Sequence, residues 1–181
     1  GEIVNAMTDE TELAVRINVK SVPVDIKGSN YVLILARMLK VLNNDIYRNK
    51  KRTSASIFSE TGYMELGDGE IGIFLIPGEL FPELYNGEFL PAEESANGKT
   101  AQYNILKNQS NAKHTFVWGL CNDELGYILP DNDFFLDSKV PYINGGKDKF
   151  DRSHYEETNS TGPDTARILL DACEKIISSV K

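Results

Sequence analysis

Three short segments of the sequence place titratable side chains beside glycine- or proline-containing turns, where such groups could do chemistry. They span residues 75–82, 119–130 and 154–163. The first contributes the carboxylate of Glu79, and the second contributes the phenol of Tyr127. The third combines His154, Tyr155 and Glu156 ahead of a predicted helix. Carboxylates, phenols and imidazoles can bind metal ions or move protons, so these five residues form the candidate site.

Each segment also has a purely structural interpretation, which the sequence leaves open. Glu79 could interact with the dipole of a predicted short helix over residues 79–85, an effect of about 0.3–1 kcal/mol. Tyr127 could be an ordinary strand tyrosine with its hydroxyl at the rim of the core. Ser160 or Thr161 could cap the following helix, although capping does not require the three titratable residues that precede them.

A self-contained hydrolase is a further alternative, with His154 as general base and Glu156 or Glu157 as its orienting carboxylate. This alternative lacks an evident nucleophile, because Ser153 and Ser160 lie outside the strand–turn–helix context of a nucleophilic serine.

Common metal-binding and catalytic motifs are missing from the sequence. His114 and His154 are its only histidines, too few for the usual three-ligand nitrogen site of zinc. There is no HExxH, CxxC or GxSxG motif, and no glycine-rich phosphate loop follows a predicted strand. Cys121 and Cys173 show no metal-ligand spacing, and we expect buried free thiols.

The elements around these segments predict a layered domain. Alternating or continuous apolar patterns predict strands over residues 13–19, 54–66, 70–76, 115–120 and 125–129, with an extended edge segment over 20–27. The alternation in the first strand predicts one buried face. Gly67-Asp68-Gly69 predicts a hairpin. Strands mixed with helices in this order predict an α/β class, with α+β as the alternative: a layered mixed β-sheet packed by helices.

Two longer helices are predicted besides the short one at Glu79. Residues 30–43 are apolar around most of the circumference, so we expect a helix capped by Ser29 and packed on two sides. The last helix should start at Gly162-Pro163-Asp164, with Pro163 at its first position, and its apolar stripe from Ala166 to Val180 should pack on the sheet.

Composition sets the remaining limits. The chain has 181 residues, 41% hydrophobic and 25% charged, as expected for a single domain over residues 1–181 without an internal boundary. A net charge of -8 argues against a nucleic-acid surface, and no apolar run reaches the length of a transmembrane segment.

The sequence starts with Gly1, and we expect a cleaved tag or a cut inside a longer chain, with no signal peptide in view. The basic cluster at residues 48–52 is predicted to be a solvated loop.

In combination and in this order, the three segments resemble the neutral ceramidase family, also called neutral/alkaline non-lysosomal ceramidases. The matching pieces are Pro77-Gly78-Glu79, residues 122–127, and Tyr155-Glu156 leading through Gly162-Pro163 into the terminal helix. The resemblance runs from about Ser56 to the C-terminus and corresponds to the C-terminal half of the family's catalytic domain.

The resemblance implies a zinc-dependent hydrolase. Glu79 and Tyr127 match two zinc ligands of the family, and Tyr155 matches a phenol that stabilises the developing oxyanion. His154 and Glu156 then become candidates for residues that support these groups. The family's two histidine ligands belong to the N-terminal half, and neither histidine of this chain lies in such a motif. One zinc ion is therefore expected only together with the N-terminal half of the same protein, and this piece alone should be inactive.

The resemblance further implies a small-molecule or lipid amide substrate and a secreted or cell-surface location. Residues 131–151 look inserted relative to the family, and no β-sandwich domain follows the last helix. The alternative function is a non-catalytic module that retains the scaffold and binds a protein or glycan through its acidic loops. A piece that has lost its packing partner could also expose an apolar face and self-associate.

Overall fold

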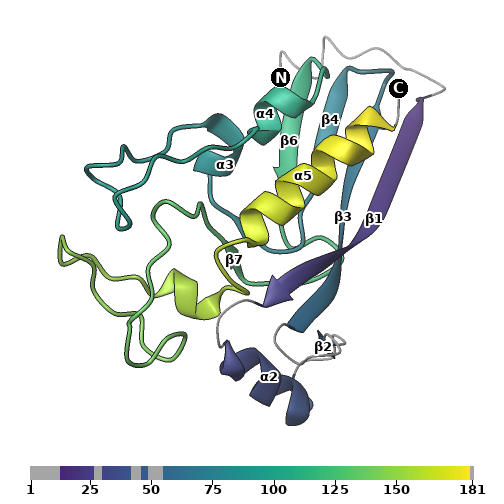
Figure 1. The fold of residues 1–181 in the computed structure, drawn as a ribbon. Coiled ribbons are helices and arrows are strands. Elements are labelled where there is room, and N and C mark those ends of the chain that lie inside the picture. The colour runs from purple at the N-terminus through teal and green to yellow at the C-terminus, as the bar shows by residue number, and fades with distance from the viewer. Residues whose placement is uncertain (1–12, 27–29, 42–45, 49–54, 180–181) are drawn as a thin grey trace, which may run out of the picture.

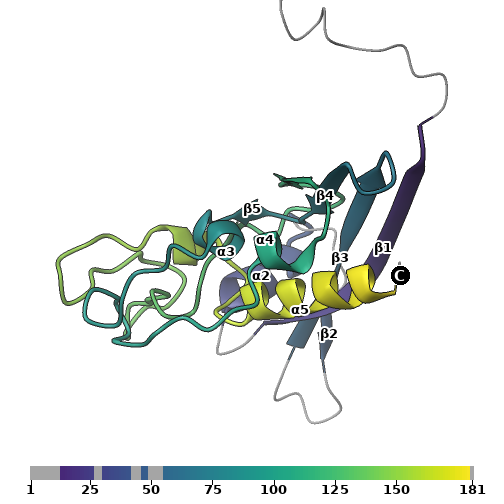
Figure 2. The same cartoon turned by 90° about the horizontal axis from the view of Figure 1, so that it is seen from above.

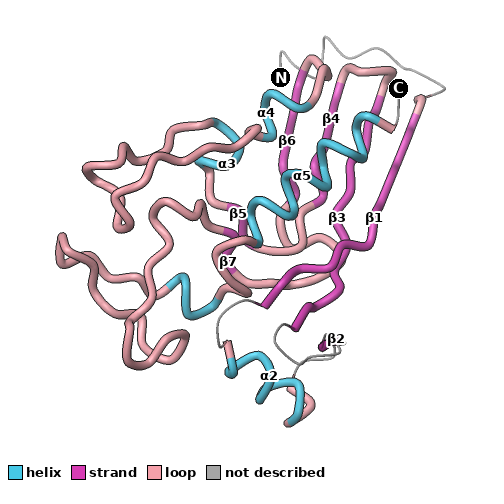
Figure 3. Tube along the Cα trace, viewed as in Figure 1, coloured by secondary structure: helices cyan, strands magenta, loops and turns pink. Residues whose placement is uncertain are grey.

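A five-stranded mixed sheet is the centre of the fold (Figures 1 and 3). In this computed structural model, the residues described are 13–26, 30–41, 46–48 and 55–179. The strands are β1 (Val15–Ile26), β2 (Ile46–Arg48), β3 (Ala55–Leu66), β4 (Ile71–Leu75) and β6 (His114–Trp118). Their order is β1-β3-β4-β6, with β2 also paired to β3. All neighbours are antiparallel except β4 and β6, which are parallel. With helices packed on it, this mixed sheet confirms the predicted layered class in its α+β form.

The predicted hairpin joins β3 to β4. Leu66 pairs with Ile71, and Gly67, Asp68 and Gly69 all have positive φ angles, of 68°, 51° and 94°. Left-handed backbone at consecutive turn positions matches the right-handed twist of the two strands, and glycine and aspartate tolerate it best.

The last helix covers one face of the sheet. Helix α5 (Thr165–Ser178) packs on β1 and β3, as predicted, and it lies in front of them in Figure 1. Its buried stripe includes Leu169, Cys173 and Ile176, which join Phe74 of β4 in the main core. The helix begins two residues after Pro163, not at it, because Gly162 accepts a hydrogen bond from Thr165 in a preceding turn.

Strand β1 has the predicted edge position, but its first half is more exposed than predicted. It lies at an edge of the sheet, where Pro23 costs no ladder partner on its outer side, as predicted. Val22, Val24 and Ile26 in its second half are buried. In its first half, however, the predicted buried face is wrong. The alternating side chains there and just before the strand are 47–56% exposed: Leu13, Val15, Ile17 and Val19.

The predicted helix over residues 30–43 is shorter and more exposed than expected. Helix α2 spans Tyr31–Met38 and buries none of its residues. Asn30 caps it by accepting a hydrogen bond from the backbone N–H of Leu33, at 3.3 Å. The helix ends because Lys40 adopts left-handed backbone, with φ of 59°. Ser29 and residues 42–43 lie outside the described residues, as does most of the basic cluster.

Smaller elements connect the sheet to a loop-rich lobe. A two-stranded parallel sheet joins β5 (Glu79–Leu80) to β7 (Tyr127–Ile128). The short helices are α3 (Glu83–Asn86), α4 (Leu106–Gln109) and the 3-10 helix η1 (Glu156–Asn159). The predicted helix over 79–85 is therefore wrong at its start, since Glu79 lies in a strand.

The lobe combines residues 88–104 with the long excursion at 130–153, on the same side of the molecule in Figure 1. Asp133 accepts a hydrogen bond from the backbone N–H of Ala96, which joins the two segments. Phe134 and Tyr142 are buried with Leu129 in a small separate core. The excursion is thus partly packed, as its interleaved aromatic residues predicted. In the described part of the chain, no helix is long and apolar enough to cross a membrane.

Candidate functional site

The pairing of β5 with β7 brings Glu79 and Tyr127 together. The two residues are direct partners in the parallel ladder, and Glu79 donates its backbone N–H to the carbonyl of Gly126 at 3.0 Å. Partnered residues of neighbouring strands point their side chains to the same side. The two side chains therefore leave the strands on the same side, and both line one pocket. Figure 3 shows β5 and β7 side by side between the main sheet and the lobe.

Tyr155 completes this group from the start of η1. Its hydroxyl oxygen lies 3.3 Å from that of Tyr127, and the two rings meet edge to face with centroids 5.9 Å apart. The Tyr155 side chain is 53% exposed, so its hydroxyl is accessible from solvent. Three side chains from three separate segments thus meet at one place.

Gly126 allows this close approach. It forms an isolated bridge with Ser160, which holds the end of η1 against β7. Its φ is 78°, and a Cβ atom here would collide with the backbone carbonyl of Asn159. Any other residue would push η1, and Tyr155 with it, away from Tyr127.

The surroundings of Tyr127 raise the pKa of its phenol. Its hydrogen bond with Tyr155, partial burial and the negative charges of Glu79 and Glu156 together raise the pKa of Tyr127 to about 12. The phenol therefore keeps its proton at neutral pH unless a cation is bound beside it. Glu156 contributes the smallest of these effects through its charge, and its supporting role stays a prediction.

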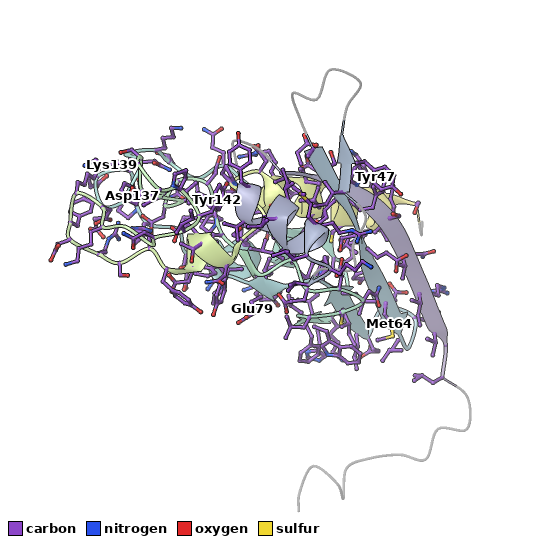
Figure 4. The ribbon with its side chains drawn as sticks, turned by 90° about the horizontal axis from the view of Figure 1, so that it is seen from below. Tyr47, Met64, Glu79, Asp137, Lys139 and Tyr142 are labelled. Carbon is purple, nitrogen blue, oxygen red and sulfur yellow. The ribbon has the colours of Figure 1, made fainter. Side chains whose placement is uncertain are left out.

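These groups line an open pocket of about 390 Å³. Glu79, Tyr127 and Tyr155 form one part of its wall, while Val32 and Leu33 of α2 form an apolar part. Glu79 is exposed at the surface, as Figure 4 shows from below. Among the described residues, its carboxylate has no hydrogen-bond or ion-pair partner. An uncompensated carboxylate next to a phenol can accept a cation.

His154 lies in a different environment. Its side chain is buried, with Nδ1 2.6 Å from Oε1 of Glu157 and Nε2 3.2 Å from Oδ2 of Asp148. Phe135 packs against the ring. Both ring nitrogens are buried and face carboxylates, with Nδ1 in a hydrogen bond and Nε2 without one among the described residues, so burial keeps the ring from a substrate. The Ser160 hydroxyl accepts a hydrogen bond from the backbone N–H of Gly162. The geometry therefore counts against the self-contained hydrolase.

The charges around His154 form a buried cluster that the sequence interpretation missed in part. Asp148 also pairs with Arg152, because Nη2 of Arg152 lies 2.6 Å from Oδ2 of Asp148. The same Nη2 lies 3.0 Å from Oδ1 of Asp133. The sequence analysis offered Glu156 or Glu157 as the partner of His154, and the structure places Glu157 there. The other acids and the arginine carry no local signal, because they belong to an irregular loop.

The titration behaviour of this cluster follows from burial and pairing. Burial alone would lower the pKa of His154, but the carboxylates of Glu157 and Asp148 raise it above its ordinary value. Burial would raise the pKa of Asp148, but hydrogen bonds from Arg152 and other donors hold it well below its usual range. Burial raises the pKa of Glu157, and the hydrogen bond with His154 offsets this only in part. Pairing with the two acids thus favours the protonated form of the imidazole.

Asn30 is a further residue of the pocket wall that the sequence did not single out. It is 2% exposed, and its side-chain amide donates to the carbonyl of Ser160 at 2.9 Å. This bond ties α2 to the segment that follows η1. In the sequence, Asn30 is indistinguishable from an ordinary cap residue.

The described chain supplies at most half of a metal site. No group of three or more His, Cys, Asp or Glu side chains within the described ranges could hold a metal ion. His114 lies at the start of β6, paired with Ile71 at the end of β4 that is distant from Glu79. Histidine ligands to a metal at Glu79 and Tyr127 would therefore have to come from outside the described residues.

Comparison of the chain with protein-family models, with curated proteins and with solved structures finds no match. The resemblance of the three segments to neutral ceramidases therefore stays a prediction.

Proposed function

We propose that this chain contributes one half of a zinc-dependent amide or ester hydrolase site resembling that of neutral ceramidases. The observation that carries the proposal is the convergence of three side chains: Glu79 faces Tyr127 in the β5–β7 ladder, and the hydroxyl of Tyr155 lies 3.3 Å from that of Tyr127. These residues are the ones that the sequence resemblance assigns to the metal and to the oxyanion.

The donor set fits a divalent cation in two respects. The Glu79 carboxylate is exposed, and it has no competing partner among the described residues. The pKa of the Tyr127 phenol is raised first by its hydrogen bond with Tyr155 and by burial, and then by the negative charge of Glu79, which a bound cation would offset. Since a ligating phenol must lose its proton, metal affinity should rise with pH.

The chain's own residues then have separate tasks. Zinc, when bound, supplies Lewis acidity that polarises the scissile carbonyl and activates water. Glu79 and Tyr127 would hold it. Tyr155 would donate its O–H to the carbonyl oxygen as negative charge develops there, a contribution of about 3 kcal/mol for one such donor. The apolar wall formed by Val32 and Leu33 would accommodate the apolar part of a small-molecule or lipid amide.

The remaining ligands are assigned to the N-terminal half of the same protein. Catalytic zinc sites use three protein ligands and keep one position for water or substrate. With two oxygen donors, the present chain alone should bind zinc weakly and show no activity.

Metal analysis of the longer protein, including its N-terminal half, tests this function. We expect about one zinc ion per chain in the wild type and loss of zinc in Glu79→Gln and Tyr127→Phe. Glu93→Gln is the matched control, because Glu93 is an exposed carboxylate of the lobe, and it should retain the metal. Undiminished zinc in Glu79→Gln would refute the assignment.

The competing proposal is the non-catalytic binding module. It gives Glu79 and Tyr155 no chemical task. A wild-type longer protein that binds no zinc and lacks hydrolase activity would favour that module.

A further inference from the structure

A small cavity of about 40 Å³ lies where the loop-rich lobe joins the rest of the molecule. It shares no lining residue with the larger pocket that contains Glu79 and Tyr127. Three of its lining residues carry side-chain oxygens, Glu83, Asn132 and Asp133, and the other four are apolar. Figures 1 and 2 show α3, which carries Glu83, between the lobe and the main sheet. The cavity therefore lies at a junction of separate segments.

The cavity also closes the end of the small β5–β7 sheet. Both parallel strands run towards it, since each is followed at once by a residue of its wall, Phe81 after β5 and Leu129 after β7. Phe81 extends the pairing by donating its backbone N–H to the carbonyl of Ile128 at 3.0 Å. A group bound in the cavity would thus join α3 to the start of the excursion at residues 130–153.

Two oxygens of the cavity residues are buried without a hydrogen-bond donor. They are Oε2 of Glu83 and Oδ1 of Asn132, and neither has a partner among the described residues. Asn132 is 1% exposed, so its side chain is enclosed on all sides. The Glu83 carboxylate also forms no ion pair in the described part of the chain. Burying such oxygens without a donor or a cation is unfavourable, so this pair of acceptors points to a bound ligand.

The orientation of the Asn132 amide is fixed by its other atom. Nδ2 donates to the carbonyl of Leu90 at 3.1 Å, so the side-chain atom that remains is the oxygen, which can only accept. Turning the amide over would set this oxygen against the Leu90 carbonyl. Asn132 and Glu83 therefore both present acceptors, and neither can satisfy the other.

Asp133 adds a third oxygen to the cavity. Its Oδ1 accepts hydrogen bonds from the backbone N–H of Ala96 at 2.7 Å and from Nη2 of Arg152 at 3.0 Å. Its Oδ2 has no partner within the described ranges. Because Arg152 offsets the charge of Asp133, the uncompensated charge at the cavity is that of Glu83.

The size of the cavity and the type of its donors define the ligand. About 40 Å³ holds one ion with one or two waters, whereas organic ligands occupy about 300–1,000 Å³. Oxygen donors without nitrogen or sulfur favour a hard cation over zinc. Calcium accepts irregular sets of carboxylate, amide and water oxygens, whereas magnesium requires a near-ideal octahedron. With two carboxylates and one amide, the set lies outside the groups of three His, Cys, Asp or Glu, of which the described ranges hold none.

We propose that Glu83, Asn132 and Asp133 bind one calcium ion, which fastens the lobe to the ends of β5 and β7. Water molecules complete the coordination, because the three side chains supply only part of the roughly six to eight oxygens that calcium takes. This site is independent of the proposed function, since it shares no residue with the zinc site.

Thermal unfolding of the 181-residue chain, followed by circular dichroism after removal of metal by chelation, tests the site. In about 10 mM calcium chloride, the Tm of the wild type should rise by at least about 3 °C more than in magnesium chloride of the same concentration. Magnesium chloride controls for screening of the net charge of -8, because both salts have the same ionic strength. A rise no larger in calcium than in magnesium would overturn the proposal and leave a cavity filled by water alone.

Glu83→Gln removes the uncompensated charge and should abolish the calcium-specific rise in Tm. In chelator this variant should be at least as stable as the wild type, because its amide can donate to Oδ1 of Asn132. Glu93→Gln, which neutralises an exposed carboxylate of the lobe, is the matched control and should keep the rise. A calcium-specific rise of wild-type size in Glu83→Gln would overturn the proposal.

Isothermal titration calorimetry counts the ion and locates it. We expect one calcium ion per wild-type chain and binding at least about tenfold weaker in Glu83→Gln. Glu79→Gln should bind calcium as the wild type does, because Glu79 lines the other pocket. Binding lost in Glu79→Gln and retained in Glu83→Gln would place the ion in that pocket and overturn the proposal.

Discussion

The buried cluster around His154 makes a strong prediction about stability. Replacing His154 by alanine removes the positive charge that separates Glu157 and Asp148, whose carboxylates are both buried. Asp148 keeps Arg152 as a partner, whereas Glu157 keeps only backbone N–H groups, that of Phe135 at 3.1 Å and its own. Glu157 is therefore the group left without compensation.

The expected loss can be worked from these contacts. Removing one partner of a buried ion pair costs about 3–5 kcal/mol. Because burial already raises the pKa of Glu157, this carboxyl can take up a proton in the variant, which places the loss near the lower end, at about 3 kcal/mol. For a domain of this size, that loss lowers the Tm by roughly 6–12 °C.

The pH dependence has a definite sign. The pKa of His154 is raised above its ordinary 6.5, so its contribution to the free energy of unfolding is fully present below pH 6.5. The contribution is lost as the pH rises through the raised value. The difference between wild type and His154→Ala should therefore be largest near pH 6 and should shrink towards pH 9.

Urea unfolding at pH 6 and at pH 9 measures both effects. Lys147→Ala is the control, since Lys147 and Asp151 form an ion pair whose side chains are 62% and 82% exposed, and it should cost less than about 1 kcal/mol. A loss below about 1 kcal/mol for His154→Ala at pH 6, or one that does not change with pH, would refute the reasoning. Since Tyr155 follows His154 directly, the same variant should also loosen the Tyr127–Tyr155 contact.

Two further predictions concern the site itself. Gly126→Ala should lower the free energy of unfolding in urea by at least about 2 kcal/mol, because the positive φ and a collision with Asn159 both oppose a Cβ atom. Gly69→Ala is the control, since Gly69 shares the positive φ but has open space around it. An equal loss of stability in Gly69→Ala would show that the collision contributes nothing. Tyr155→Phe in the zinc-loaded longer protein should lower kcat by about 10²–10³ with little change in KM or zinc content. An unchanged kcat would remove Tyr155 from the oxyanion role.

Local patterns predicted several elements well. The hairpin at residues 67–69 and the packing of α5 on the sheet both follow from short-range signals: residues that tolerate left-handed backbone, and an apolar stripe at helical spacing. The edge position of β1 followed from Pro23 in the same way.

Other expectations failed because they depended on what packs against an element. The alternation in β1 correctly indicates an apolar face, but the side chains of that face are exposed in the first half of the strand. Helix α2 is apolar and yet buries none of its residues. Glu79 lies in a strand instead of a helix, because β7 supplies a ladder partner from a segment far along the chain.

The sequence alone determined which residues could do chemistry and which surfaces are apolar, since side-chain type and spacing are local properties. Only the tertiary structure decided that Glu79 and Tyr127 are partners, that Gly126 brings Tyr155 to them, and that His154 turns instead into a buried cluster. The physical reason is that backbone pairing between distant segments sets the direction of each side chain, and no local pattern encodes that pairing.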